Sequence, residues 1–511
     1  MRSIYLKQAP RIKTVVLPDP FVNGCVWRSY GKGFETMERM LLSLIVVICV
    51  FTAQAATADE PHGSAKIDSV SAELVAHESA SYFDTFSGGG SIVDRVTELE
   101  TSFSEAKEDI AKLQSDVKKK VDFGHAHEKM KIVGRVHTDY WGFPDSSPGI
   151  NTLEYGDPTI PPQARLGFRR LRFGVRGEVS PNMDYRIEME FAGGAKTEFK
   201  DAWIGFKHLP FLQTVLIGQQ KRPYGLDHLN SSRFNVFMER PFATETFNED
   251  ARRFGVAAYG VSDDLAYNWR YGVYNMQNIK LTGNYVNNNL QPEFAGRFAN
   301  TIWYDESSDG RGYAAWAVSG TYAQPDGNGV PNSSISRSQG FFRTKPEARS
   351  KSRWYDTGTI PGADSYGLLG GEAVVNVGPV QWVAEYQNVW MGRDGGSDLS
   401  FGGGYTYVSY FLTGEHMVWN RKTGTLGRLV PFENFFLVNR GRDGVDGVGR
   451  GWGAWQVAVR GSYLDLNDED ILGGYGKSVT FGLNWYWNAY ARMQLNYIYG
   501  NLSDRDASND P

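Results

Sequence analysis

The chain of 511 residues has little cysteine, no strong positive charge and no long apolar run. Its two cysteines, Cys25 and Cys49, lie in the first tenth of the sequence, so the rest holds no disulfide framework and no cysteine-ligated metal. A net charge of −5 argues against a nucleic-acid-binding protein with a broad basic face. No apolar run reaches the roughly 20 residues of a membrane-spanning helix, which excludes a helical membrane bundle.

Catalytic motifs are absent from the sequence as well. There is no HExxH zinc-protease motif and no GxSxG nucleophile elbow. We therefore predict no enzyme, no catalytic residues, no metal site and no cofactor.

The composition favours β structure. Hydrophobic residues make up 41% of the chain, aromatic residues 14%, and there are 58 glycines against 21 prolines. These values exclude a disordered polyelectrolyte and a collagen. Aromatic enrichment is typical of strands.

The N-terminal region resembles an export signal. The longest apolar run covers residues 41–56, follows Arg39 and ends in small residues up to Ala58, which is typical of a secretory signal peptide. A retained anchor is the alternative, but the run has only about 16 residues where about 20 are needed. Because the segment before Met37 lacks any signal pattern, we hypothesise that translation starts at Met37 or Met40, so that residues 1–58 are a misassigned start plus signal peptide.

We expect N-terminal sequencing of the exported protein to begin after Ala58, because small residues precede that bond as signal peptidases require. A sequence that begins at or before Met1 would contradict both the cleavage and the late start.

A flexible linker (59–90) and a coiled-coil helix (91–121) are predicted next. Apolar residues recur there with unbroken 4-3 spacing, which is a coiled-coil seam. They are Ile92, Val96, Leu99, Phe103, Ala106, Ile110, Leu113 and Val117. A self-associating helix is implied, and a single amphipathic helix packed on its own domain is the alternative.

From about Ile132 the hydrophobic period changes to two. In residues 479–488 the odd positions are Val, Phe, Leu, Trp and Trp, and the even positions are Thr, Gly, Asn, Tyr and Asn. About 15 such segments follow one another, with arginine and glutamate recurring on the polar face. A water-soluble sandwich would need only about seven to nine strands, and it would turn its apolar face inward. The pattern therefore predicts an all-β fold, a closed antiparallel transmembrane β-barrel over residues 130–502 with a C-terminal tail at 503–511.

The length and the connections agree with a barrel of about 16 strands. Residues 130–502 would supply about 23 residues for each strand with its connection. Short connections (179–184, 261–264, 378–379 and 488–489) are expected to alternate with long outer loops (223–250, 325–364 and 414–450).

Alternation places several arginines on the inner face. Residues 165–176 contain five arginines and no acidic residue, and parity turns Arg170, Arg172 and Arg176 toward the lumen together with Arg135 and Arg186. Guanidinium groups there would bind anions. Equally, these arginines could pair with glutamates of the next strand, Glu188 and Glu190, and leave the wall neutral.

Several stretches resemble the phosphate-selective porin O and P family. They are RLGFRRLRFGVRGEV (165–179), GQQKRPYGLD (218–227), SSRFNVFMERPF (231–242), WQVAVRGSYLDLND (455–468) and LNWYWNAYARMQLNYIY (483–499). The resemblance implies a passive trimeric channel of the outer membrane with sixteen strands. It also implies an inward-folded loop that narrows the pore, and basic side chains on the lumen wall that attract anions.

By this resemblance, residues 218–253 form the constriction. The basic residues that would draw anions there are Lys221, Arg222, Arg233, Arg240, Arg252 and Arg253. Charged rings at a narrowing determine which ions pass. Asp227, Glu239 and Glu245 lie in the same stretch, so two alternatives remain. The stretch could form a cation-preferring pore, or it could be a solvated outer loop.

The predicted function is passive diffusion of small anionic, phosphate-like solutes across the outer membrane. The expected partners are such solutes, outer-membrane lipid and two further copies of the chain in a homotrimer; contact with the cell wall is a further option, and nucleic acid is not a partner. The alternatives are a structural anchor that tethers the membrane through the coiled coil, and a non-selective or cation-preferring porin.

Overall fold

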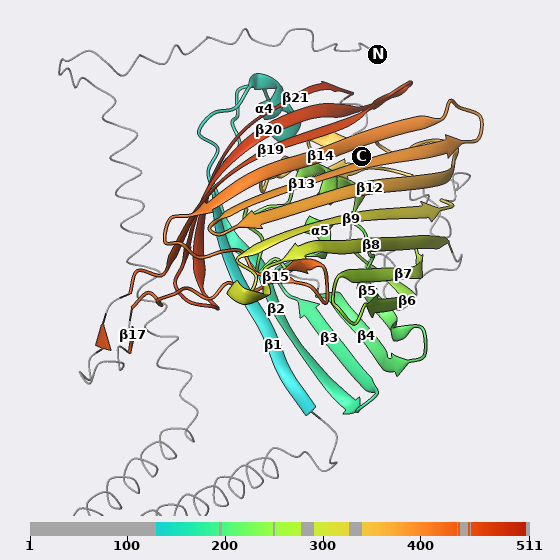
Figure 1. Cartoon of the computed structure of the whole chain (residues 1–511). Coiled ribbons are helices and arrows are strands. Elements are labelled where there is room, and N and C mark those ends of the chain that lie inside the picture. The colour runs from blue at the N-terminus through green and yellow to red at the C-terminus, as the bar shows by residue number, and fades with distance from the viewer. Residues whose placement is uncertain are drawn as a thin grey trace, which may run out of the picture. The chain divides into compact units, whose positions relative to one another are not determined.

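A computed structural model describes residues 129–193, 197–248, 251–276, 291–325, 340–436, 438–439, 448–449 and 451–506. One antiparallel sheet of 15 strands dominates this part of the chain, and each strand pairs with the sheet strands before and after it in sequence (Figure 1). The predicted signal peptide, linker and coiled coil lie outside the described residues.

The sheet strands follow one another in chain order. They are β1 (Lys129–Trp141), β2 (Arg165–Ser180), β3 (Met183–Glu190), β4 (Glu198–Leu209), β5 (Gln213–Lys221), β6 (Arg252–Val261), β7 (Tyr267–Asn275), β8 (Pro292–Tyr304), β9 (Gly312–Ala323), β12 (Ala363–Val377), β13 (Val380–Arg393), β14 (Leu399–Phe411), β19 (Ala454–Asp468), β20 (Ile471–Tyr486) and β21 (Arg492–Arg505).

Short elements occupy the connections. They are the helices α4 (Pro148–Tyr155), α5 (Leu226–Leu229) and α6 (Phe242–Phe247), the 3-10 turn η2 (Glu306–Ser308), and the two-residue strands β10 (Arg343–Thr344), β11 (Tyr355–Asp356), β15 (Trp419–Asn420), β16 (Thr425–Leu426), β17 (Val438–Asn439) and β18 (Val448–Gly449). Among the residues that the structure describes, every helix is too short or too polar to cross a bilayer.

The two faces of the sheet differ as the alternation predicts. On β20, Val479 and Phe481 are 40% and 51% exposed, whereas the intervening Thr480 and nearby Asn484 are fully buried. The apolar side chains therefore cover the outer surface and the polar ones lie inside, the reverse of a water-soluble protein. An outer surface of this kind is suited to lipid.

The strand number is one fewer than predicted within the described residues. The estimate of about 16 strands assumed that each strand and its connection use the same number of residues. The connections 222–251, 324–362 and 412–453 use more residues than that, so fewer strands are formed. Since neighbours are antiparallel and 15 is an odd number, the edge strands β1 and β21 run in the same direction. In the described part of the chain, β1 pairs with β2 alone and β21 with β20 alone.

The sheet has two unlike ends. Most long connections, such as 222–251 and 324–362, join strands at one end, which we call the loop end. At the other end, the turn end, connections such as 181–182 and 378–379 have two to seven residues. The connection 412–453 is the exception, because counting strands places it at the turn end. The prediction of an outer loop at 414–450 was therefore wrong: residues 394–398 and 469–470 make short connections at the loop end and reverse the expected alternation.

Connecting segments pack against one side of the interior. Apolar side chains of the segments, including Tyr224, Phe242 and Tyr355, form a buried cluster with inward residues of the later strands. Glu347, in the connection after β9, accepts a hydrogen bond from the Arg460 guanidinium of β19 at 2.7 Å. Inward polar residues of this wall are almost fully buried, for example Gln456 at 0%. The inner face of β1 to β4 is unevenly exposed, since the side chains of Arg172 and Arg186 are 11% and 25% exposed whereas Glu188 is fully buried.

Candidate functional site

Charged side chains concentrate on the inner face of β1 to β4 and the start of β6. Glu188 on β3, whose side chain is fully buried, contacts three of the predicted arginines: Arg135 at 3.4 Å, Arg172 at 3.0 Å and Arg186 at 2.6 Å. Strand pairing brings these groups together, because Arg172 lies opposite both Arg135 and Glu190 in the ladder. All three arginines therefore lie on the same face of the sheet as Glu188.

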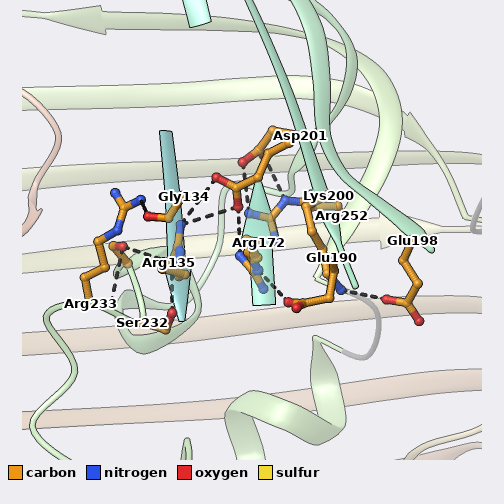
Figure 2. Close-up of polar contacts among 12 residues, drawn as sticks. Gly134, Arg135, Arg172, Glu190, Glu198, Lys200, Asp201, Ser232, Arg233 and Arg252 are labelled. Atoms are coloured by element: carbon orange, nitrogen blue, oxygen red, sulfur yellow. Dashed lines mark hydrogen bonds and ion pairs between the residues drawn. The ribbon is translucent and has the colours of Figure 1, made fainter. Parts of the chain in front are cut away.

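The cluster continues onto β4 and β6. The Arg252 guanidinium binds Asp201 through two nitrogens at 2.8 and 3.0 Å, and Arg186 reaches the same carboxylate at 3.3 Å. Glu190 accepts from Arg172 Nε at 2.6 Å. Figure 2 shows how these side chains converge from separate strands. We call this group of four arginines and three carboxylates the ionic cluster; its members are Arg135, Arg172, Arg186, Arg252, Glu188, Glu190 and Asp201.

The alternative prediction, that glutamates pair with these arginines and neutralise their charge, is therefore correct for part of the wall. Four arginines of the cluster meet three carboxylates, so one positive charge is left over. Further predicted arginines lie beside the cluster without a carboxylate partner among the described residues. Arg170 is 5% exposed and forms no hydrogen bond or ion pair within the described residues, although the Glu239 carboxylate attracts it at longer range. Arg176 is exposed and likewise unpaired there, and Arg233 donates to the Gly134 carbonyl at 2.9 Å.

A β-bulge adds an arginine that alternation assigned to the outer face. The ladder between β1 and β2 shifts register so that His137 opposes Arg170 while Thr138 opposes Phe168, which leaves Arg169 as the extra residue. Arg169 turns inward and forms a two-pronged ion pair with Glu239, with one nitrogen-to-oxygen distance of 2.7 Å. No sequence signal distinguished this residue, since a bulge changes parity locally.

Four of the predicted basic residues make polar contacts with other parts of the chain: Lys221, Arg222, Arg240 and Arg253. The Lys221 ammonium donates to the carbonyls of His228, Leu229 and Asn230 at 2.6 to 3.0 Å, at the C-terminal end of α5, where backbone carbonyls lack helical partners. The Arg222 guanidinium is buried against Glu293 at 3.0 Å.

The other two make similar structural contacts. Arg240 pairs with Asp227 at 3.5 Å and Glu245 at 3.4 Å, and Arg253 Nε donates to the Met276 carbonyl at 2.7 Å. The contacts of Lys221 and Arg222 join residues 222–248, which we call the constriction segment, to β5 and β8, whereas Arg240 pairs within the segment.

Ion pairing also changes the acidity of this segment. Burial by itself raises the pKa of the Glu239 carboxyl, but attraction to Arg169 outweighs it and holds that pKa at about 2. Burial likewise raises the pKa of the Asp227 carboxyl, which the nearby Arg240 only partly offsets. Glu239 thus carries its charge throughout the neutral range and anchors the segment to β2.

The constriction segment also spans both edge strands from inside. On β1, Arg135 Nη1 donates to the Ser232 hydroxyl at 2.9 Å. On β21, Gln494 Nε2 donates to the Val236 carbonyl at 2.9 Å, and Asn496 Oδ1 accepts from the Met238 amide at 2.8 Å. Residues 231–238 therefore connect the first strand of the sheet to the last.

A metal site finds no support in the described ranges, where histidine, cysteine, aspartate and glutamate do not gather in groups of three or more that could hold an ion.

Comparison with known proteins identifies the family. The model of the phosphate-selective porin O and P family matches residues 132–511. The chain belongs to this family. It is accordingly an outer-membrane channel protein, and the outer membrane is where it is located. A relative from Caulobacter vibrioides, described as an uncharacterized protein, is 26% identical over 386 residues, 73% of this chain and 69% of the relative.

Solved structures of low identity are similar over most of their length. A loop L8 deletion mutant of OmpT, an outer membrane protein of Vibrio cholerae, is 12% identical with a TM-score of 0.44, covering 74% of this chain and 96% of its own. The anion-selective porin of Comamonas acidovorans is 13% identical with a TM-score of 0.40, covering 73% and 89%.

Replacing Glu239 with glutamine is expected to loosen the constriction segment at neutral pH and to remove its response to acid. A carboxyl whose pKa falls from 4.5 to about 2 on folding stabilises the fold fully above pH 4.5, and this contribution is lost as the pH falls toward 2. Single-channel recordings should therefore show wild-type current becoming noisy below about pH 3, whereas Glu239→Gln is noisy already at pH 7.

The matched control is Glu245→Gln, because Glu245 lies in the same segment but contacts Arg240 only at 3.4 Å. It should behave as the wild type. Quiet current from Glu239→Gln at pH 7 would contradict an anchoring role for the pair.

Proposed function

We propose that the sheet closes into a trimeric barrel that lets small anions of the phosphate type diffuse passively across the outer membrane, with the turn end facing the periplasm. The observation that carries this proposal is the excess of arginine on the inner face of β1 to β4. Arg170, Arg176 and Arg233 have no carboxylate partner among the described residues, and they adjoin an ionic cluster that is itself positive by one charge.

Closure is supported by the lipid-facing chemistry and by the constriction segment. An open sheet edge in hydrocarbon would leave backbone amides and carbonyls unpaired at several kcal/mol each. Hydrogen bonds from residues 231–238 to both β1 and β21 hold these edges near each other on the lumen side. Because the two edges run in the same direction, direct pairing between them would be parallel.

Anion preference is favoured over cation preference by the pairing of the acids. Glu239 is bound to Arg169, and Asp227 and Glu245 both lie beside Arg240, so the constriction presents few free carboxylates. At an effective dielectric constant of about 20, one unpaired charge attracts an anion about 15 Å away by about 1 kcal/mol. Several such arginines are sufficient to bias permeation by sign without any binding step of high affinity.

The triple variant Arg170→Gln, Arg176→Gln and Arg233→Gln tests the proposal. Removing three charges of about 1 kcal/mol each should lower the anion-to-cation permeability ratio by roughly tenfold or more. The measurement is the reversal potential of the purified protein in a planar bilayer under a salt gradient. Arg393→Gln, which removes an arginine paired with Asp470 at the loop end, is the control and should leave the ratio unchanged. An unchanged reversal potential in the triple variant would contradict anion selection by these residues.

The double variant Gln494→Ala and Asn496→Ala tests closure. It removes the hydrogen bonds that Gln494 donates to the Asn235 and Val236 carbonyls and to Asn484 Oδ1, and the one that Asn496 accepts from the Met238 amide. The free energy of unfolding should fall by about 4 kcal/mol, at about 1 kcal/mol for each bond. Samples are heated to a series of temperatures before electrophoresis, and the measurement is the temperature at which the band of the folded protein disappears. Asn501→Ala on the same strand, where the side chain accepts only from the Lys477 amide, is the control. Equal temperatures for the double variant and the control would argue against the link.

A further inference from the structure

The connection 412–453 begins on the inner side of the sheet and continues on the outer side. Inside, the Trp419 side chain of β15 is buried against the inner wall. Outside, the Phe435 ring meets the Trp485 ring edge-on, with ring centroids 4.5 Å apart. Trp485 belongs to the outward set of β20, because it shares parity with the exposed Phe481. The chain therefore crosses the rim between the two aromatic contacts.

A small lobe of this connection rests on the outer face of β19 and β20. We call it the foot; its residues are 432–436 and 451–453. The Trp485 ring stacks on Trp455 of β19 at 4.9 Å, and both indole nitrogens donate to the Trp452 carbonyl, at 2.8 and 3.2 Å. The Phe435 amide donates to the Trp487 carbonyl at 2.7 Å. Such pairing suits a contact that lipid surrounds, because polar groups without partners are costly in hydrocarbon.

The outer surface of the foot is apolar and exposed. Phe432 is 66% exposed, Phe436 54% and Trp452 77%. Neighbouring outward residues of the two strands, Val457 and Phe481, are apolar and exposed as well. The foot thus extends the lipid-facing surface of the sheet, and an exposed apolar patch of this kind marks a contact with membrane or protein.

The foot lies at the level of the membrane edge. Lys477 is exposed on the outer face of β20, and its ammonium lies over the Tyr475 ring at 5.2 Å, as at a boundary between lipid and water. Trp485 is eight residues further along the same strand. At about 3.4 Å per residue and a tilt of about 40°, this distance covers about 20 Å of an apolar band about 25 Å tall. Trp485, and Phe435 with it, therefore lies just inside the turn-end edge of the hydrocarbon.

We propose that the foot docks into the leaflet at the turn end, where its aromatic rings contact the acyl chains and ester groups of phospholipid. Aromatic side chains suit this zone, and tryptophan in particular combines an apolar body with a polar edge. Continuity with the outward residues of β19 and β20 favours lipid over a second copy of the chain as the occupant. That this leaflet is the periplasmic one rests on the proposed function, which orients the turn end toward the periplasm.

Labels at single positions test the foot in phospholipid vesicles. In a background with Cys25→Ser and Cys49→Ser, Phe436→Cys and Trp452→Cys each supply the only thiol, which is labelled with bimane. Both side chains are exposed, so their replacement leaves the packing intact. Phospholipid with bromine atoms high on its acyl chains should quench most of the fluorescence at both positions, and iodide in the water should quench little. Asp263→Cys, exposed in the turn 262–266 at the same end, is the control and should respond to iodide alone.

Strong quenching by iodide and none by brominated lipid at both foot positions would overturn the proposal. So would protection from both quenchers together with cross-linking between the thiols of neighbouring copies, because a second copy would then cover the foot. Neither readout needs a current, so the two proposals fail separately. Normal conductance with a foot in water refutes the foot alone, and a lipid-embedded foot in a silent bilayer refutes the channel alone.

Discussion

The structure depends on one constraint: side chains alternate between an apolar outer face and a polar interior, while every strand must pair its backbone. For example, Phe481 is 51% exposed and the neighbouring Thr480 is fully buried. Such alternation suits a sheet with hydrocarbon on its outer side and polar contacts on its inner side. Once the outer face is committed to lipid, charged groups have only the interior to occupy. The ionic cluster and the constriction segment both follow from that confinement.

The interior is not evenly filled, and this asymmetry determines where solutes can pass. Segments from both ends pack against the later strands and bury their inward amides and hydroxyls, as at Gln456 and Asn484. The inner wall of the first four strands keeps partly exposed arginines. A passage along that wall would place solutes next to the exposed Arg176 and the partly exposed Arg186, so the same packing that stabilises the inserted segments also positions the proposed selective surface.

Alternation in the sequence predicted the strands, their two faces and the inward direction of Arg135, Arg172 and Arg186. It could not predict Arg169, because a bulge changes parity at one residue. Nor could it predict that Arg222 pairs with Glu293, 71 residues away, since a charge in the sequence does not name its partner. The connection 412–453 was assigned to the wrong end for a similar reason. The end on which a connection lies depends on every strand before it, and two short connections at the loop end were not expected.

The central claim is that a lipid-facing cylinder encloses a positively charged aqueous path. Its most direct test is the zero-current potential of the purified wild-type protein in a planar bilayer separating concentrated from dilute potassium chloride. The account predicts stepwise conductance with a potential of the sign that chloride permeation produces. A bilayer that stays silent with folded protein inserted would contradict the channel, and a potential of the sign set by potassium would contradict the role given to the arginines.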